Sequence, residues 1–327
     1  MQTVKFNKYH FSLLWRNLGK VMLITSLTFL DGCIQDIDIS SAGGGEIKIV
    51  IEGRIDSGQP AEVFVMRSSP LSSTTDYKTF FFVNDAKVIV SDGTTTDTLV
   101  LLPLKKPDIE SAYYYPYKGK KIIGTPGKTY TLTVIASPDT TTTSVKIYKT
   151  YTATTTIPTP VALDSVWWKA QAPYDTLGYA WAHLSEPAGL GNAYKWYAKR
   201  ANKWYEKGEK KDRRYLAPPT GSTFDDKFMD GTSFDLFYNR GTDPSDSLTE
   251  ANPTDAMNYF KKTDTIYIKF CAIDRVTYQF YTTYETAYQT NGNPFASPVN
   301  IISNINGGGL GVWAGFGCTY DTIIPKP

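Results

Sequence analysis

Hydrophobic and polar residues alternate along most of the chain in short runs, which is the pattern of strands with one buried face. In one such run Tyr130, Leu132 and Val134 share a face, and after another the pair Asp92-Gly93 permits a tight turn. Runs of this kind in the first half of the chain lie at 47–52, 62–66, 87–90, 98–102, 129–136 and 145–156. Their spacing favours an antiparallel β-sandwich over residues 46–156, of the immunoglobulin-like or carboxypeptidase-regulatory-like type.

The strand pattern breaks at residues 157–163, where two closely spaced prolines predict a linker. Strand-like runs return in residues 164–327, with one change of period. One stretch repeats its apolar residues every four positions: Val276, Phe280, Tyr284 and Tyr288. This spacing predicts an amphipathic helix at about 275–290. The sequence therefore predicts a mainly β protein with two antiparallel β domains, the second of which carries one helix.

The first 32 residues have the features of a secretory signal peptide, because basic residues precede a short uncharged run that ends near small residues. That run is too short to cross a bilayer as a helix, which needs about 20 residues. It ends in Leu30-Asp31-Gly32-Cys33, which resembles a bacterial lipobox, although Asp31 stands where a small or apolar residue is usual. We expect cleavage after residue 32, acylation (palmitate included) of Cys33, and a polar tether at 33–45. Ordinary secretion with an unmodified cysteine is the alternative.

Composition changes the picture once the leader is removed. The whole chain has a net charge of +2, but residues 1–32 contain four of the 34 Lys and Arg and one of the 32 Asp and Glu, so the mature chain stands at −1. A nearly neutral chain gives no argument for nucleic-acid binding. Aromatic residues make up 14% of the chain, with 23 Tyr, which favours strands over helices.

Few residues suited to metal binding or nucleophilic catalysis remain. Cys271 and Cys318 either pair as a disulfide, which is usual in an exported chain, or stay as two separate thiols. Their spacing is not that of a zinc or redox motif. His183 is the single histidine of the mature chain, and its alternating context favours a packed or surface residue. We therefore predict no metal site and no cofactor.

Carboxylates offer a second route to catalysis, because glycoside hydrolysis needs two of them. Asp225, Asp226 and Asp230 cluster in the sequence and are candidates for catalytic acids or calcium ligands. They do not follow the spacing of a helix-loop-helix calcium site. The alternative, which the sequence favours, is that these aspartates stabilise turns and cap helices.

Residues 194–215 have the most unusual local composition, because aromatic residues alternate with cations. Aromatic faces with flanking cations can stack on a sugar or a peptide, or attract an anionic surface. The simpler interpretation is a solvated β-hairpin, whose aromatic residues cover the sheet and whose lysines keep its loop soluble. The residues that we single out as possible contacts to a ligand or partner are Trp196, Trp204, Tyr205, Lys207, Arg213 and Arg214.

Several stretches spread over the mature chain resemble a known family. The most specific reads Gly292-Asn293-Pro294-Phe295-Ala296-Ser297-Pro298-Val299-Asn300, and it is followed by Ser303-Asn304-Ile305 and by a glycine-rich run with Val312-Trp313-Ala314-Gly315. Weaker motifs are Ile51-Glu52-Gly53-Arg54-Ile55, Arg67-Ser68-Ser69-Pro70-Leu71 and Lys87-Val88-Ile89-Val90-Ser91-Asp92-Gly93. Together they resemble the Bacteroidetes domain-of-unknown-function family 4249.

The resemblance implies an outer-envelope lipoprotein, often encoded beside a TonB-dependent outer-membrane receptor, and it carries over no catalytic residue. Asp36 and Asp38 resemble the surface-export signals of some Bacteroidetes lipoproteins. We expect a non-enzymatic protein that is anchored in the outer membrane through acylated Cys33 and assists such a receptor in ligand capture or uptake. The cell surface is favoured for its body, and the periplasmic face is the alternative. A carboxylate-dependent envelope hydrolase and a purely structural or adhesive β-sandwich are the alternatives.

Overall fold

A computed structural model describes residues 46–68, 82–102, 116–139, 146–200, 215–218, 220–241, 259–290, 293, 295–297 and 299–324. All of them belong to one compact unit, Glu46–Pro327. The predicted signal peptide, the lipidation site Cys33 and the tether lie outside the described residues. So do five of the predicted contact residues, namely Trp204, Tyr205, Lys207, Arg213 and Arg214.

The prediction of a mainly β protein is confirmed, and the predicted helix corresponds to α5 (Arg275–Thr290). The strands of the first half are β1 (Ile49–Asp56), β2 (Pro60–Arg67), β3 (Lys87–Ser91), β4 (Thr96–Thr98), β5 (Val100–Leu101), β6 (Tyr117–Ile123), β7 (Thr129–Ala136) and β8 (Lys149–Thr156). Those of the second half are β9 (Ser165–Ala170), β10 (Leu177–Ser185), β11 (Ala193–Arg200), β12 (Thr223–Asp225), β13 (Ser233–Tyr238), β14 (Phe260–Lys261), β15 (Ile266–Ile273) and β16 (Leu310–Ile323). No helix among the described residues is long and apolar enough to cross a membrane.

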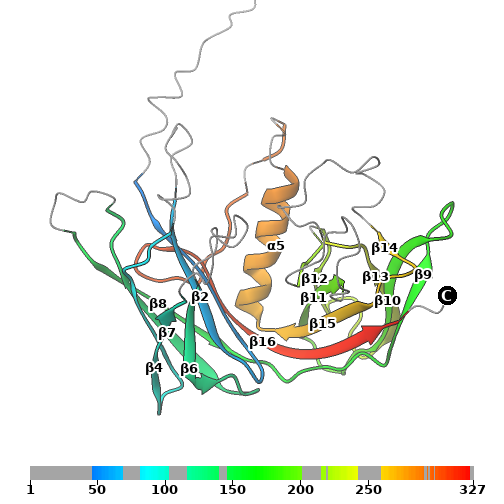
Figure 1. Ribbon diagram of the computed structural model, residues 1–327, viewed down its shortest axis with the longest axis horizontal. Coiled ribbons are helices and arrows are strands. Elements are labelled where there is room, and N and C mark those ends of the chain that lie inside the picture. Colours follow the sequence, from blue (N-terminus) through cyan, green and yellow to red (C-terminus); the bar gives the residue numbers. More distant parts are fainter. Residues whose placement is uncertain are drawn as a thin grey trace, which may run out of the picture. The chain divides into compact units, whose positions relative to one another are not determined.

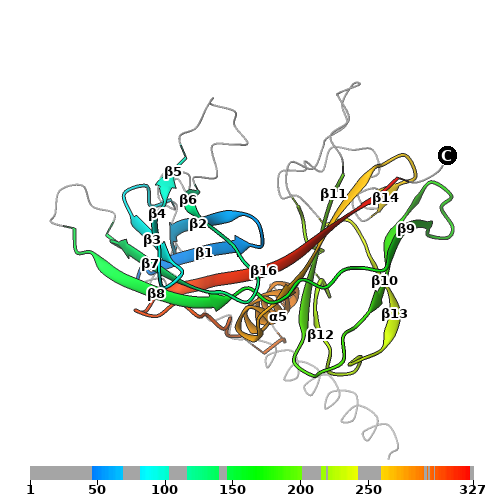
Figure 2. The same ribbon diagram turned by 90° about the horizontal axis from the view of Figure 1, so that it is seen from below.

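The largest sheet runs through both halves of the chain, in the order β12-β11-β15-β16-β1-β2-β6-β5. The 14-residue strand β16 is long enough to join them (Figures 1 and 2). Its first half pairs in parallel with β1, from Val50 opposite Leu310 onward, and its second half pairs antiparallel with β15. The predicted segments 46–156 and 164–327 therefore share one sheet.

Two smaller sheets cover one face of the large sheet. The sheet β4-β3-β7-β8 encloses a core with the first half, which includes Ile51, Ile55 and Leu132, and Trp313 of β16 enters this core. The sheet built on β10, with β9 on one side and β13 and β14 on the other, encloses a second core that includes Trp196 and Phe270. Each half is thus a sandwich, as the alternating sequence predicts.

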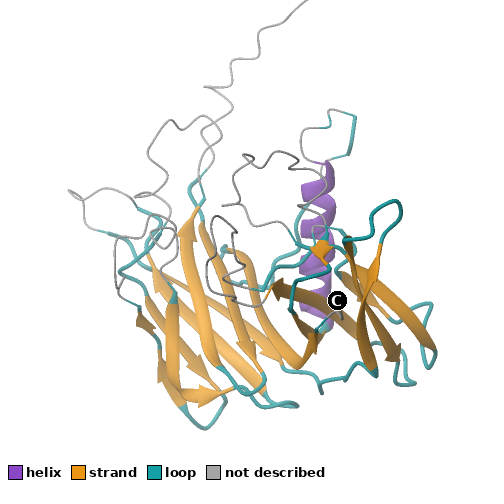
Figure 3. Ribbon diagram, turned by 45° about the vertical axis from the view of Figure 1, so that its right-hand side comes forward, coloured by secondary structure: helices purple, strands orange, loops and turns teal. Residues whose placement is uncertain are grey.

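Helix α5 lies on the opposite face of the large sheet (Figure 3, purple). Its first turn is capped by Asp274, whose Oδ1 accepts a hydrogen bond from the backbone N–H of Thr277 at 2.8 Å. Beneath it lies a third, small cluster that contains Cys271, Cys318 and Phe316.

Candidate functional site

The clearest candidate for a binding site is the outward face of the sheet that β9, β10 and β13 form. Along β10, small or apolar residues such as Ala180 and Leu184 point into the core, whereas Tyr179, Trp181 and His183 point away from it. The larger side chains of this strand are therefore on the outer face, which is the reverse of an ordinary amphipathic strand.

Rings from three neighbouring strands are in contact across this outer face. Trp181 of β10 stacks on Trp167 of β9, with ring centroids 6.1 Å apart, and on Phe237 of β13 at 4.6 Å. Tyr179 contacts Phe237 at 5.3 Å and Tyr259 at 5.1 Å. We call the set Trp167, Tyr174, Tyr179, Trp181, Phe237 and Tyr259 the aromatic face. Cross-strand ring pairs of this kind contribute about 0.5–1.5 kcal/mol each beyond their buried area, so the face is a rigid platform.

The aromatic face is partly exposed and carries a polar border. Half of the surface of Phe237 is accessible to solvent, and the other rings are partly accessible. The ammonium group of Lys169 lies 4.9 Å from the centre of the Trp181 ring. Burial raises the pKa of Tyr179 to about 12, and its hydrogen bond with Tyr259 adds to the effect, so its hydroxyl stays neutral. Rings surrounded by hydrogen-bonding groups are typical of protein interfaces.

His183 sits beside the aromatic face and forms a pair with Asp235. Its Nδ1 lies 2.7 Å from Asp235 Oδ1, and both side chains are more than a third exposed. Within the described residues, no hydrogen bond joins His183 to the hydroxyl of a serine. Ser185 and Ser233 instead bond to each other at 3.0 Å. Asp235 lies beside His183 as the carboxylate lies beside the histidine base of a catalytic triad. Among the described residues, however, no serine hydroxyl is hydrogen-bonded to His183 to act as the nucleophile.

The predicted carboxylate cluster is rearranged in the structure. Asp225 points to Arg275, at 2.8 Å, and Glu186 takes its place beside Asp226 and Asp230. One oxygen from each of these three carboxyl groups lies within 4.8 Å of the others. Glu186 and Asp226 are buried.

Each of the three carboxylates accepts hydrogen bonds from backbone N–H groups of nearby loops, which gives it a structural role. The backbone N–H groups of Gly191 and Asn192 donate to Asp226, that of Gly189 donates to Asp230, and that of Gly231 donates to Glu186. These oxygens therefore hold the two loops together, as the alternative of turn and cap service predicts. Sequence reasoning did not single out Glu186.

A pocket of about 480 Å³ lies between residues 158–161 and the ends of β11 and β15. Asp274 is the one carboxylate among the described residues that line it. Its Oδ2 accepts hydrogen bonds from the Thr155 hydroxyl at 2.8 Å and from the Thr156 backbone N–H at 3.3 Å, while its Oδ1 caps α5. The pocket thus lacks the pair of carboxylates that glycoside hydrolysis requires.

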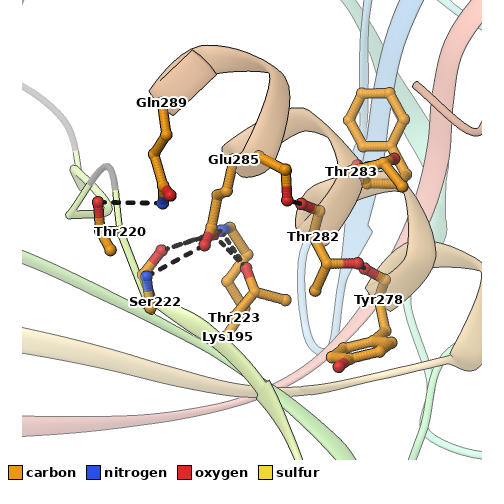
Figure 4. Close-up of polar contacts among 12 residues, drawn as sticks. Lys195, Thr220, Ser222, Thr223, Tyr278, Thr282, Thr283, Glu285 and Gln289 are labelled. Atoms are coloured by element: carbon orange, nitrogen blue, oxygen red, sulfur yellow. Dashed lines mark hydrogen bonds and ion pairs between the residues drawn. The ribbon is translucent and has the colours of Figure 1, made fainter. Parts of the chain in front are cut away.

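A buried polar network fastens α5 to the large sheet (Figure 4). Glu285 of α5 meets Lys195 of β11, with 3.2 Å between Nζ and Oε1. The hydroxyls of Ser222 and Thr223 donate to the same oxygen at 3.0 and 2.6 Å. Burial lowers the pKa of Lys195, while the negative charge of Glu285 opposes that shift. Lys195, Ser222, Thr223 and Glu285 are all buried, so this network serves to attach the helix to the sheet.

A second buried pair lies nearby on the same face of the sheet. Lys269 Nζ of β15 is 2.5 Å from Asp56 Oδ2 of β1. Lys269 also lies 5.3 Å from the ring centre of Tyr197, a residue whose pKa is raised well above its usual value by burial. Burial lowers the pKa of Lys269, and Asp56 counteracts the shift. This pair joins the two halves of the large sheet.

The structure corrects the prediction for Trp196 as a contact residue. Trp196 is completely buried in the second core, where it stacks on Tyr238 with ring centroids 4.9 Å apart. Its neighbours in β11 alternate between the core and the α5 side of the sheet, and Trp196 falls on the core side. Sequence composition alone does not show which residues of β11 face the core and which face α5.

Cys271 and Cys318 form a disulfide in the structure. They lie directly opposite each other on the paired strands β15 and β16, and both are buried beneath α5. The bond closes a long loop that contains the whole of α5.

Alternation along the sequence identifies the strands of the aromatic face but does not by itself identify the face. The signal was present: Trp167 and Lys169, like Tyr179, Trp181 and His183, occupy one phase of their strands, while alanines occupy the opposite phase of β10. A strand with alanines on one face and aromatic residues on the other has two candidates for the buried side, and here the alanine side is buried.

No curated protein matches the chain. The model of one family, described as a domain of unknown function (DUF4249), matches residues 34–319. This span covers nearly all of the chain after the predicted leader and includes every described strand up to most of β16. The chain therefore belongs to the domain-of-unknown-function family 4249.

Proposed function

We propose that this protein is a non-enzymatic lipoprotein of the cell envelope that acts by binding, with the aromatic face as its contact surface. The aromatic face is the observation that carries the proposal, because linked rings on an exposed sheet face are not needed to fill a core. Contiguous exposed apolar surface usually marks a site of interaction.

The favoured partner is a protein, a TonB-dependent receptor of the outer membrane. Trp and Tyr are enriched among the residues that dominate protein interfaces, and rings held in place lose little entropy on binding. The lipobox-like ending at Cys33 supports a membrane anchor, with the body on the cell surface of a Bacteroidetes-type envelope. In this role the protein assists the receptor in capturing or taking up a ligand.

Binding is favoured over catalysis by how the reactive groups are used. His183 bonds to Asp235 and to no serine hydroxyl in the described residues, and the carboxylates of Glu186, Asp226 and Asp230 accept hydrogen bonds from loop N–H groups. Catalysis by the exposed His183–Asp235 pair would also need a nucleophile hydrogen-bonded to His183.

The test is affinity capture of the tagged mature lipoprotein from its native membranes in mild detergent. We expect a TonB-dependent receptor to co-purify. The double variant Trp181→Thr/Phe237→Thr should weaken capture at least about tenfold, about 1.4 kcal/mol. Threonine suits a strand, so the fold should persist. Phe228→Thr is the control, since Phe228 is 87% exposed and lies outside the aromatic face. Equal capture by the variant and the control, or no receptor in any sample, would contradict the proposal.

A further inference from the structure

The described body begins at Glu46, and the surroundings of that residue define one end of the molecule. β1 starts at Ile49, and its Val50 pairs with Leu310 at the start of β16. Lys149, the first residue of β8, places its Nζ 3.5 Å from Glu46 Oε1. The starts of three strands therefore surround the point where the chain joins the body.

The far end of α5 lies on this same side (Figure 1). The helix begins beside β12, where Arg275 pairs with Asp225, and its 16 residues extend about 24 Å from there. The chain then returns along residues 299–309 to Leu310, and the Ile302 backbone N–H donates to Thr283 Oγ1 at 3.1 Å on the way. An isolated bridge between Asn306 and Thr152 ties this return segment to β8.

This end of the molecule exposes large apolar side chains. Phe295 is 95% exposed and Tyr288 is 62% exposed. Nearly half of each of Tyr284, Ile301 and Ile302 is accessible, and Leu310 is similar. We call the set Tyr284, Tyr288, Phe295, Ile301, Ile302 and Leu310 the anchor-side rim. A folded protein in water gains nothing from exposing so many large apolar groups at one end, so the rim requires an explanation.

The length of the chain before Glu46 indicates what covers the rim. If Cys33 is acylated, as the proposed function holds, the tether from residue 33 to residue 45 can span at most about 45 Å when fully extended. The end of the body that carries Glu46 therefore stays within reach of the bilayer surface at all times.

We propose that the anchor-side rim inserts into the interfacial region of the lipid bilayer and so fixes the orientation of the body. Tyr favours the level of the lipid headgroups, and Phe and Ile favour the adjoining acyl boundary, which matches the composition of the rim. A lipid anchor together with a surface contact holds a body in one orientation, whereas an anchor alone leaves it free to turn. The aromatic face, on β9, β10 and β13, belongs to a different part of the molecule and would stay available to a partner.

The experiment uses the mature chain from residue 33 with Cys33→Ser, so that any membrane binding comes from the body. It is mixed with phosphatidylethanolamine/phosphatidylglycerol vesicles and sedimented. We expect measurable association and a partition coefficient at least about tenfold lower for Phe295→Ser/Ile301→Ser/Ile302→Ser. Phe228→Ser is the matched control, because Phe228 is also highly exposed, at 87%, and follows Asp225 by three residues, and Asp225 pairs with Arg275 at the other end of α5. It should bind vesicles like the unsubstituted chain.

A second measurement covers the case in which the triple variant does not fold. In the acylated protein, Phe295→Cys and Phe228→Cys are each labelled with a polarity-sensitive dye, which two highly exposed positions tolerate. The dye at 295 should shift to the blue on vesicles while the dye at 228 should not. No association of the Cys33→Ser chain, or equal shifts at both positions, would overturn the proposal. So would a dimer that depends on the rim, since the rim would then bind a second copy. Mass spectrometry of residue 33 tests the anchor separately.

Discussion

The two faces of the eight-stranded sheet are held by different interactions. One face packs Ile55, Trp313 and Phe270 against the smaller sheets in two large apolar cores. The other face carries a small apolar cluster around the disulfide, and next to it α5 is fastened through Glu285 and Lys195. The two most buried residues of α5, Thr277 and Glu285, are both polar.

The two faces of the large sheet should differ in which substitutions they tolerate. Apolar stabilisation scales with the area removed from water, about 25 cal/mol per Å², and spreads over many neighbours. A buried ion pair stabilises only when both partners and their hydrogen bonds are present. The apolar face should therefore respond to loss of volume, and the α5 face to loss of a single partner.

Replacement of Trp313 by alanine should have the largest effect, because Trp313 fills the centre of the first core. It is fully buried, its Nε1 donates to the Tyr130 carbonyl at 3.0 Å, and its ring packs so closely on Gly53 that a side chain at position 53 would clash. Trp313→Ala should lower the free energy of unfolding by about 3–5 kcal/mol. Urea denaturation measures this, with Phe228→Ala as an exposed control that should change stability by less than about 0.5 kcal/mol. A loss below about 1 kcal/mol for Trp313→Ala would contradict the assigned role.

The apolar face is also the part that sequence could predict. Alternation identifies β7 and β10 because burial of one face imposes a period of two, and the four-residue period identifies α5. The parallel pairing of β1 with β16 could not be predicted, because it joins residues about 260 positions apart and leaves no local pattern.

The sites were harder to predict than the strands. Alternation shows that a strand has two faces but does not show which face meets water. Sequence alone therefore does not reveal the aromatic face, and it does not show that Trp196 is buried. The partnership of Lys195 with Glu285 links residues 90 positions apart, and either residue alone reads as an ordinary surface charge. Such pairs become visible only in three dimensions.

The contribution of the α5 face can be tested by replacing Glu285. Glu285→Ala leaves the ammonium group of Lys195 buried without its counter-ion, and we expect a loss of about 3 kcal/mol. The double variant Lys195→Met/Glu285→Leu should lose less than Glu285→Ala alone, because neither charge is left unpaired. Gln289→Ala, which removes an exposed contact from the same helix, is the control. If the double variant lost as much stability as Glu285→Ala alone, or more, the unpaired charge of Lys195 would not be the cause of the loss.

The pH dependence sharpens this test. Because burial lowers the pKa of Lys195 in the folded state, the unfolded chain binds more protons between that lowered pKa and the ordinary value of 10.5. Stability contributed by this residue must therefore rise with pH across that window. Above about pH 10 the raised pKa of buried Tyr197 reverses the trend, because its phenol ionises first in the unfolded chain. Urea denaturation from pH 7 to 10 should show a weaker rise for Lys195→Met than for the unsubstituted chain.

The smallest effect should come from Arg275, which pairs with Asp225 at the exposed start of the same helix. The contact is short, 2.8 Å, but the Arg275 side chain is 54% exposed and a cation is unfavourable at a helix N-terminus. Burial alone would raise the pKa of Asp225, yet the hydrogen bond and charge of Arg275 outweigh it and leave that pKa lowered. The stabilisation is thus present at neutral pH and lost as pH falls through the lowered pKa. Arg275→Ala should cost less than about 0.5 kcal/mol at pH 7, and an NMR titration should show the pKa of Asp225 moving upward. A loss of stability as large as that of Glu285→Ala would contradict this expectation. The exposed pair Arg275–Asp225 would then stabilise the protein as much as the buried pair Glu285–Lys195.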